Sequence, residues 1–238
     1  MRTSKRHLVS LIKITNNPKD VLDGNLYCNR LQRFREVEIE EMKDDIEAIA
    51  ISKYLYNSYW LRIIDEDLLS CPVFCMYSLE VKNHNCPTKI QFDNVKLKKF
   101  GCYAVVITNL KEFISRVNCK LPEFRCEAVR YIDIRNPEGV NKLPIFNPIA
   151  TKDKYFMYQQ EFRIYSRSWA LSSNTDFKIP NVKYVDESAR KFSIGDLRDI
   201  AQEYPINDLF SGIEVKLKID WDYCLKYRFQ TKLPKAFR

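Results

Sequence analysis

The chain has 238 residues, of which 45% are hydrophobic and 13% aromatic. This length and composition exclude an intrinsically disordered protein and suffice for a core without disulfides or a structural metal. The net charge of +8 favours a polyanionic partner such as nucleic acid, although a solvated basic surface without a partner has the same composition. Five glycines are too few for a fold built on several glycine-rich phosphate loops.

Eight cysteines are spread along the chain, and an even count is compatible with disulfides. Most lie in apolar runs such as 73–77 and 101–106, where reduced thiols pack as small hydrophobic groups. The Cys71–Cys75 spacing lacks a second ligand pair at zinc-finger spacing. The N-terminal residues do not resemble a signal peptide, and no apolar run approaches the ~20 residues of a membrane span. We therefore expect a cytoplasmic protein with free thiols, no metal and no membrane partner.

The first 82 residues contain both strand-like and helical segments, without a regular βαβ alternation. The predicted strands are 7–14, 25–29, 60–64 and 72–81. Asn17–Gly24 predicts a short helix, because Pro18 suits a first helical turn and Gly24 a C-terminal stop. The charge-rich segment 31–52 predicts a helix, a loop and a second helix around Asp44–Ser52.

The rest of the chain contains fewer helical signals. The predicted strands are 103–107, 128–134 and 213–219, the last with strict alternation. The apolar spacing over 109–117 predicts an amphipathic helix, and another helix is predicted over 194–202. Polar or proline-rich loops are expected at 82–88, 136–148 and 172–180, and a loose basic tail at 225–238. The pattern predicts one α+β domain over 1–238, with a mixed or antiparallel sheet and helices mainly in the N-terminal third.

The most informative motif is Gln159-x-Glu161, which directly precedes the apolar positions Phe162 and Ile164 of a predicted strand. Side chains two residues apart on an extended segment point to one side, so both can face one pocket. A carboxylate can stabilise a sugar carbon that gains positive charge, and a neighbouring carboxamide can orient a nucleophile. In the alternative interpretation, Glu161 pairs with Arg163 or a neighbouring lysine across an exposed sheet face.

Gln-x-Glu before an apolar strand, late in a small α+β domain, resembles the third motif of ADP-ribosyltransferases. The resemblance implies that NAD+ is the substrate and that its nicotinamide–ribose bond is cleaved, with Glu161 catalytic and Gln159 beside it. The family's first motif is an Arg or a His on the first strand, and His7 or Lys13 lies in that place.

The middle motif of that family, a Ser-Thr-Ser strand or a Tyr, is matched most nearly by Tyr77 or Ser78. The segment Asp23–Glu36 is similar to a Gly-x-Leu-Tyr segment of small bacterial and phage-borne proteins of this kind, in which the loop approaches the dinucleotide. The resemblance implies catalytic Tyr77 and a toxin or defence effector that modifies nucleic acid or protein. The remaining dinucleotide contacts that it implies are His7, Asn25, Tyr27, Arg30, Arg33, Ser78 and Arg163.

Two other functions fit the same sequence. A non-enzymatic module could bind nucleic acid or a protein through its basic surface and the aromatic residues Tyr155, Phe156 and Tyr158. An acidic set that includes Asp45 and Glu47 could hold Mg²⁺ in a nuclease, although a solvated helix face explains it more simply. The arginines of 30–35 suit phosphates of either a dinucleotide or a nucleic acid.

Overall fold

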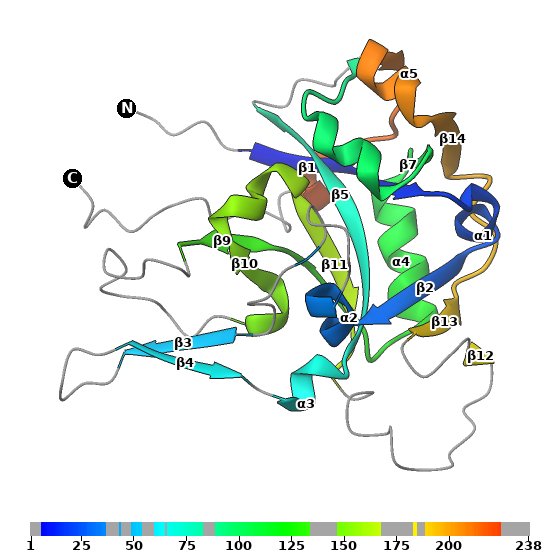
Figure 1. Ribbon diagram of the computed structural model, residues 1–238. Coiled ribbons are helices and arrows are strands. Elements are labelled where there is room, and N and C mark those ends of the chain that lie inside the picture. The colour runs from blue at the N-terminus through cyan, green and yellow to red at the C-terminus, as the bar shows by residue number, and fades with distance from the viewer. Residues whose placement is uncertain are drawn as a thin grey trace.

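The computed structural model describes residues 6–36, 43, 49–53, 60–64, 66–82, 89–133, 147–167, 183–184 and 189–224. Its centre is a nine-stranded antiparallel sheet (Figure 1). The main strand order is β12 (Lys183–Tyr184), β13 (Ala189–Ser193), β2 (Asn25–Arg30), β5 (Pro72–Lys82), β1 (Arg6–Thr15), β7 (Tyr103–Ile107) and β14 (Ala201–Pro205). A branch adds β11 (Glu161–Tyr165) beside β5, and β8 (Arg125–Ala128) beside β11.

Three two-stranded pairs accompany this sheet. They are β9 (Arg130–Ile132) with β10 (Thr151–Asp153), β6 (Lys89–Ile90) with β15 (Ile213–Glu214), and β3 (Ile49–Lys53) with β4 (Trp60–Ile64). The helices are α1 (Pro18–Leu22), α2 (Leu31–Glu36), α3 (Glu66–Leu69), α4 (Leu110–Lys120), α5 (Ile206–Ser211) and α6 (Trp221–Cys224). The 3₁₀ segments include η1 (Val95–Phe100), η3 (Pro148–Ala150) and η4 (Lys154–Gln159).

The predicted α+β class with an antiparallel sheet is confirmed. The prediction that helices gather in the N-terminal third fits less well, because α4 is the longest described helix and lies in the middle of the chain. Among the residues that the structure describes, no helix is both long and apolar enough to cross a membrane.

Helix α4 forms because its apolar residues recur at helical spacing. Phe113, Ile114 and Val117 are fully buried in the main core. The helix begins after Asn109, whose side chain accepts a hydrogen bond from the Glu112 backbone N–H at 3.2 Å. The predicted amphipathic helix is therefore confirmed, and it packs against the sheet.

The two faces of β5 have different neighbours. Phe74 and Met76 join the main core, together with Phe162 and Ile164 of β11. Cys75 lies on the opposite face, opposite Arg163 in the β5–β11 register. A second, smaller apolar cluster covers part of this opposite face, and its buried members are Leu31, Leu68, Cys71, Val73, Ile149 and Tyr165.

The helix predicted over 194–202 is wrong. Residues 198–200 form a turn, and Ala201 begins β14. Ile194, Leu197 and Ile200 are buried at a spacing of three, so the apolar period is real. However, the N–H groups of Ile194 and Leu197 donate to Gly24 and Leu22 rather than to a preceding helical turn.

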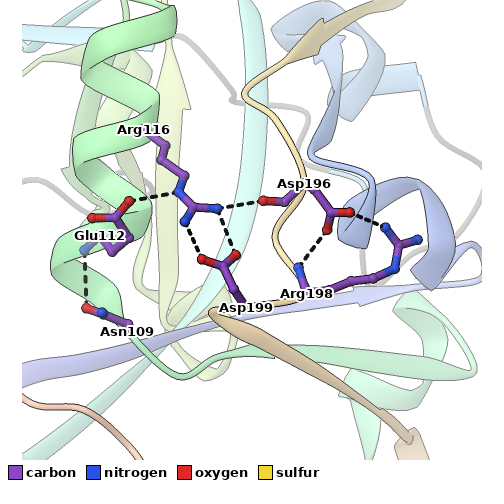
Figure 2. A network of polar contacts seen from close by, with 6 residues as sticks. All are labelled: Asn109, Glu112, Arg116, Asp196, Arg198 and Asp199. Carbon is purple, nitrogen blue, oxygen red and sulfur yellow. Dashed lines mark hydrogen bonds and ion pairs between the residues drawn. The ribbon is translucent and has the colours of Figure 1, made fainter.

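Charged side chains fix this segment against α4 (Figure 2). Arg116 donates from Nε to Glu112 at 2.9 Å and forms a two-point ion pair with Asp199. Asp196 accepts from both the backbone and the side chain of Arg198, at 2.8 and 2.7 Å. These local hydrogen bonds favour a turn over a helix, because the Asp196 side chain accepts the hydrogen bond of the Arg198 backbone N–H.

Three further predictions need correction. Ile49–Ser52, placed in a second helix, belongs to strand β3. The strand predicted over 128–134 is two strands, β8 and β9, on either side of Val129. The strand predicted over 213–219 pairs only at Ile213–Glu214, although buried Val215 and Leu217 alternate with exposed neighbours. The predicted tail at 225–238 and the loop at 172–180 lie outside the described residues.

Candidate functional site

A cavity of about 590 Å³ lies where the central sheet divides. Strand β5 pairs with β1 through residues 77–82 and with β2 only through Pro72 and Val73, on the same edge. Residues 74–76 of β5 therefore face a gap between β1 and β2, which α1 connects. Figure 1 shows that β1 and β2 each lead away from β5 and that both reach α1. We call this gap the fork.

Polar side chains and aromatic rings line the fork from both strands and from the segment before β11. They include Lys13, Asn16, Asn25, Tyr27, Asn29, Phe34, Tyr77, Lys152, Gln159 and Glu161. A cavity of this volume suits a ligand the size of a nucleotide or dinucleotide.

Glu161 is the centre of a buried charge network at the inner end of the fork. One carboxylate oxygen accepts from Arg163 Nε at 2.7 Å, and the other accepts from Lys152 Nζ at 3.1 Å. The Cys75 thiol also hydrogen-bonds this carboxylate. Glu161 is 5% exposed and Arg163 is fully buried, so water screens these contacts little.

The network keeps the Glu161 carboxyl ionised. Burial alone would raise its pKa, but Arg163 and Lys152 outweigh burial and hold the pKa far below its usual range. Burial and the neighbouring Glu161 charge raise the pKa of the Cys75 thiol. Cys75 is therefore a protonated donor to Glu161 at neutral pH rather than a thiolate nucleophile.

The backbone around Glu161 is held as firmly as its side chain. Its N–H donates to the Tyr131 hydroxyl at 2.7 Å, and its carbonyl accepts from the Val129 N–H at 2.8 Å. The preceding residue, Gln160, adopts a left-handed conformation with φ 40° that ends η4. This turn, rather than simple strand alternation, brings Gln159 and Glu161 to the same cavity.

Gln159 and Glu161 share a cation. Lys152 Nζ donates to the Gln159 side-chain oxygen at 2.8 Å as well as to Glu161, and its ammonium lies 4.9 Å from the centre of the Phe156 ring. Lys152 is 3% exposed and belongs to β10, seven residues before Gln159 and nine before Glu161 along the chain. The pairing fixes the carboxamide oxygen toward the lysine and leaves its NH₂ group on the other side.

Lys13 brings a second cation to the fork. Its Nζ donates to the Cys75 carbonyl at 2.8 Å and lies 4.4 Å from the centre of the Phe74 ring. Within the described part of the chain, its ammonium has no carboxylate within ion-pair distance. Burial lowers its pKa, which is the effect expected for a cation that lacks an anionic partner.

The structure brings half of the predicted site residues together. Gln159, Glu161, Tyr77, Asn25 and Tyr27 line the fork, as does Lys13. Tyr77 lies opposite Glu161 in the β5–β11 register, and burial raises its pKa to about 12.

The other predicted dinucleotide contacts do not line the cavity. Arg163 contacts two residues that do, because it bonds to Glu161 and its guanidinium lies 5.8 Å from the centre of the Phe34 ring. His7 is buried, with its ring 6.1 Å from that of Trp221. Ser78 is buried on β5. Arg30 ends β2, and Arg33 is exposed on α2, where Phe34 is the residue that reaches the fork.

The alternative interpretation of Glu161 is half correct. Glu161 does pair with Arg163 and with a lysine, but on a buried face rather than an exposed one. Lys152, Tyr131 and Phe34 were missed, because each reaches the site through tertiary packing and none has a local sequence signal. Only the spacing of Glu161 and Arg163 indicated part of this network.

Two further groups of side chains are the candidate metal ligands and the cysteines. The described residues contain no group of three or more metal-ligating side chains, and the set with Asp45 and Glu47 lies outside them. Every described cysteine is free, and Cys28, Cys71 and Cys224 are buried. The expectation that the thiol in the apolar run 101–106 is packed is wrong, because Cys102 is exposed, as is Cys119.

Comparisons with known proteins assign no function to the site. No family model, no curated protein and no solved structure matches this chain. Fold and site together define an antiparallel α+β protein with a cavity in a divided sheet and an ionised carboxylate at its inner end. On β1 the cavity has a cation, Lys13, that has no carboxylate partner among the described residues.

Proposed function

We propose that the fork binds NAD+ and that the protein is an ADP-ribosyltransferase. The observation that carries this proposal is that Gln159 and Glu161 line one cavity, with the carboxylate held ionised. In the reaction, the bond between C1′ of the ribose and the nicotinamide nitrogen breaks, and nicotinamide leaves with the bonding electrons. The acceptor nucleophile then bonds to C1′ and releases its proton; with water as acceptor, the product is ADP-ribose.

An ionised Glu161 suits this reaction because the ribose ring becomes an oxocarbenium-like cation in the transition state. A carboxyl that could protonate near neutral pH would serve as an acid instead. The neighbouring cations Arg163 and Lys152 reduce this stabilisation of the transition state, because they offset part of the negative charge of Glu161. The role therefore assigned to Glu161 is electrostatic stabilisation and a hydrogen bond to a ribose hydroxyl, and Gln159 orients the nucleophile.

Lys13 supplies the charge that a dinucleotide requires. Its ammonium lacks a carboxylate partner among the described residues, so a phosphate would be a favourable one. The opposite wall, with Asn25 and Tyr27 of β2, offers an amide and an aromatic ring for the remainder of the ligand.

The test is incubation of the protein with NAD+ and measurement of nicotinamide release. We expect release by the wild type and a loss of about 10²–10³-fold in Glu161→Gln, the size seen when one stabilising group is removed. Because this variant also disturbs the buried network, circular dichroism must show that it is folded. Glu203→Gln, at an exposed position on β14, is the matched control and should retain activity.

A second variant tests the proposal if Glu161→Gln fails to fold. Lys13→Met removes the cation and leaves the hydrogen bonds of Glu161 to Lys152 and Arg163 in place, and it should weaken NAD+ binding measured by calorimetry. Wild-type protein that releases no nicotinamide, or full activity in folded Glu161→Gln, would refute the assignment.

A further inference from the structure

A patch of exposed apolar and cationic side chains lies beside the fork. It is formed by η1 and η4, and its members are Val95, Lys96, Lys99, Lys154, Tyr155 and Met157; we call it the η1–η4 patch. Val95 is 69% exposed, Met157 60% and Tyr155 53%, the three highest values among the large hydrophobic side chains that the structure describes. Side chains of this kind concentrated at one place indicate a binding surface.

The aromatic ring of the patch is held in place while it remains accessible. Tyr155 packs edge-on against Phe156, with ring centres 5.1 Å apart and planes at 90°. Its backbone N–H donates to the Asp153 side chain at 2.9 Å. Phe156, a candidate for an exposed aromatic from the sequence, is instead buried at 2% exposure and acts as this support. Tyr155 therefore presents a positioned ring rather than a loose one.

One cation contacts this ring, and the two other cations of the patch belong to the same two 3₁₀ segments. Lys96 Nζ lies 5.0 Å from the centre of the Tyr155 ring and 5.2 Å from that of Tyr158. Lys99 is exposed on the same turn, and Lys154 precedes Tyr155 and pairs with Asp133. The patch thus has an excess of positive charge beside an exposed ring.

We propose that the η1–η4 patch binds single-stranded nucleic acid, with a base stacked on Tyr155 and backbone phosphates near Lys96 and Lys99. Stacking on an aromatic ring requires an unpaired base, which a single strand offers and a duplex does not. Lysines beside the ring complement the phosphates, and the chain as a whole carries a charge of +8. This inference does not require the fork to be an enzyme site.

The location of the patch gives it a relation to the fork. Leu97 and Phe100 of η1 and Gln159 of η4 line the cavity, while other residues of the same two turns form the patch. A strand bound to the patch would therefore lie at the rim of the fork. If the proposed transferase activity holds, that strand is placed as its acceptor.

The test is binding of a short fluorescein-labelled single-stranded oligonucleotide, measured by fluorescence anisotropy at low and at physiological salt. We expect Tyr155→Ala to weaken binding about tenfold, the size expected for the loss of one base–aromatic stack. Lys96→Gln should reduce the slope of log affinity against log salt by about 0.7. Tyr103→Ala and Lys216→Gln, exposed positions outside the patch, are the matched controls.

Competing ligands decide between base stacking and simple charge. A duplex of the same sequence and heparin should both bind more weakly than the single strand, and Tyr155→Ala should change their affinities little. Equal affinity for all three ligands, an unaffected Tyr155→Ala or no binding at all would overturn the inference.

The proposed transferase activity of the fork and the proposed strand binding by the patch can each be refuted without the other. Glu161→Gln should retain strand binding, because Glu161 lies in the fork and not in the patch. Tyr155→Ala should retain nicotinamide release in the absence of nucleic acid. Loss of strand binding in folded Glu161→Gln would contradict the separation of the two sites.

Discussion

Glu161 shows how one residue can be both structural and chemical. Its carboxylate compensates two buried cations, Arg163 and Lys152, and it also faces the cavity. Removing one partner from a buried ion pair costs about 3–5 kcal/mol, because the charge that remains is uncompensated. The contacts that hold Glu161 ionised thus also make it a contributor to stability.

The stability of the protein should depend on this carboxyl in acid. An unfolded Glu binds its proton near pH 4.3, whereas folded Glu161 remains ionised far below that pH. As the pH falls below about 5, the unfolded state gains a proton that the folded state does not, so the free energy of unfolding decreases. We expect Glu161→Gln to be less stable than wild type at pH 7 and to lose stability less steeply between pH 5 and pH 3.

Urea denaturation midpoints at pH 7, 5, 4 and 3 measure this difference. Some acid dependence should persist in the variant, because hydrogen bonds also lower the pKa of Asp196 and Asp199. Glu203→Gln should follow the wild-type profile, and parallel profiles for wild type and Glu161→Gln would contradict the expected role.

For single residues, the sequence predicts which functional groups lie at the site better than it predicts whether they are buried. Gln159 and Glu161 were identified from their spacing, and the Glu161–Arg163 pair follows from the period of a strand. Burial was not predictable, because the residues that pair with or bond to Glu161, such as Lys152 and Tyr131, belong to separate elements.

At the scale of elements, local signals were most reliable where one strong period and a capping residue agreed. The helix over 110–120 satisfies both conditions through its apolar stripe and Asn109. Over 194–202 the apolar spacing was present, but Gly195 and the Asp196 side chain favour a turn. Over 213–219 the alternation was present, but a neighbouring strand pairs with only two residues. Whether a segment pairs as a strand depends on the neighbouring strand, and a local sequence pattern does not identify that neighbour.

Helix α4 offers a direct test of what stabilises an element. Phe113→Ala should lower the free energy of unfolding by about 3–5 kcal/mol, because a fully buried ring leaves a cavity. Asn109→Ala should cost about 1 kcal/mol through loss of the N-terminal cap. Chemical denaturation followed by circular dichroism measures both.

Ser115→Ala, at an exposed position on the same helix, is the control and should leave stability nearly unchanged. If Phe113→Ala and Asn109→Ala had equal effects, packing would not be the main stabilising term of α4.

For the whole molecule, contacts between distant segments decide the shape of the fork. The Gly24 carbonyl accepts from the Ile194 N–H at 2.9 Å, and Arg198 pairs with Asp23 at 2.5 Å. Strand β13 then pairs with β2 from Ser193 opposite Asn25 to Ala189 opposite Asn29. The wall of the fork on β2 is thus held by residues more than 150 positions later, which no local pattern indicates.

Two glycines test this long-range closure. Gly24 has φ +75°, and an added Cβ would lie 1.8 Å from the Gly195 carbonyl oxygen, so Gly24→Ala should separate the two segments. Gly195 has φ +87° with open space around it, so Gly195→Ala should cost only the backbone strain of about 1–2 kcal/mol. Thermal denaturation should therefore show a larger fall in Tm for Gly24→Ala.

Ligand binding distinguishes a local from a global effect of that change. Gly24→Ala should also weaken binding in the fork, since Asn25 directly follows Gly24. Equal loss of stability in the two variants would show that the close approach at Gly24 is unimportant.

The division of the central sheet also has a consequence for biosynthesis. Lys13 and Tyr27 emerge early from a ribosome, Gln159 and Glu161 much later, and the β13 residues that hold β2 later still. The fork cannot be complete on a nascent chain until nearly two hundred residues have been made, because its last supporting strand ends at Ser193. A growing polypeptide would thus lack a complete fork until β13 has been made, and any ligand that requires both walls of the fork could bind only after that point.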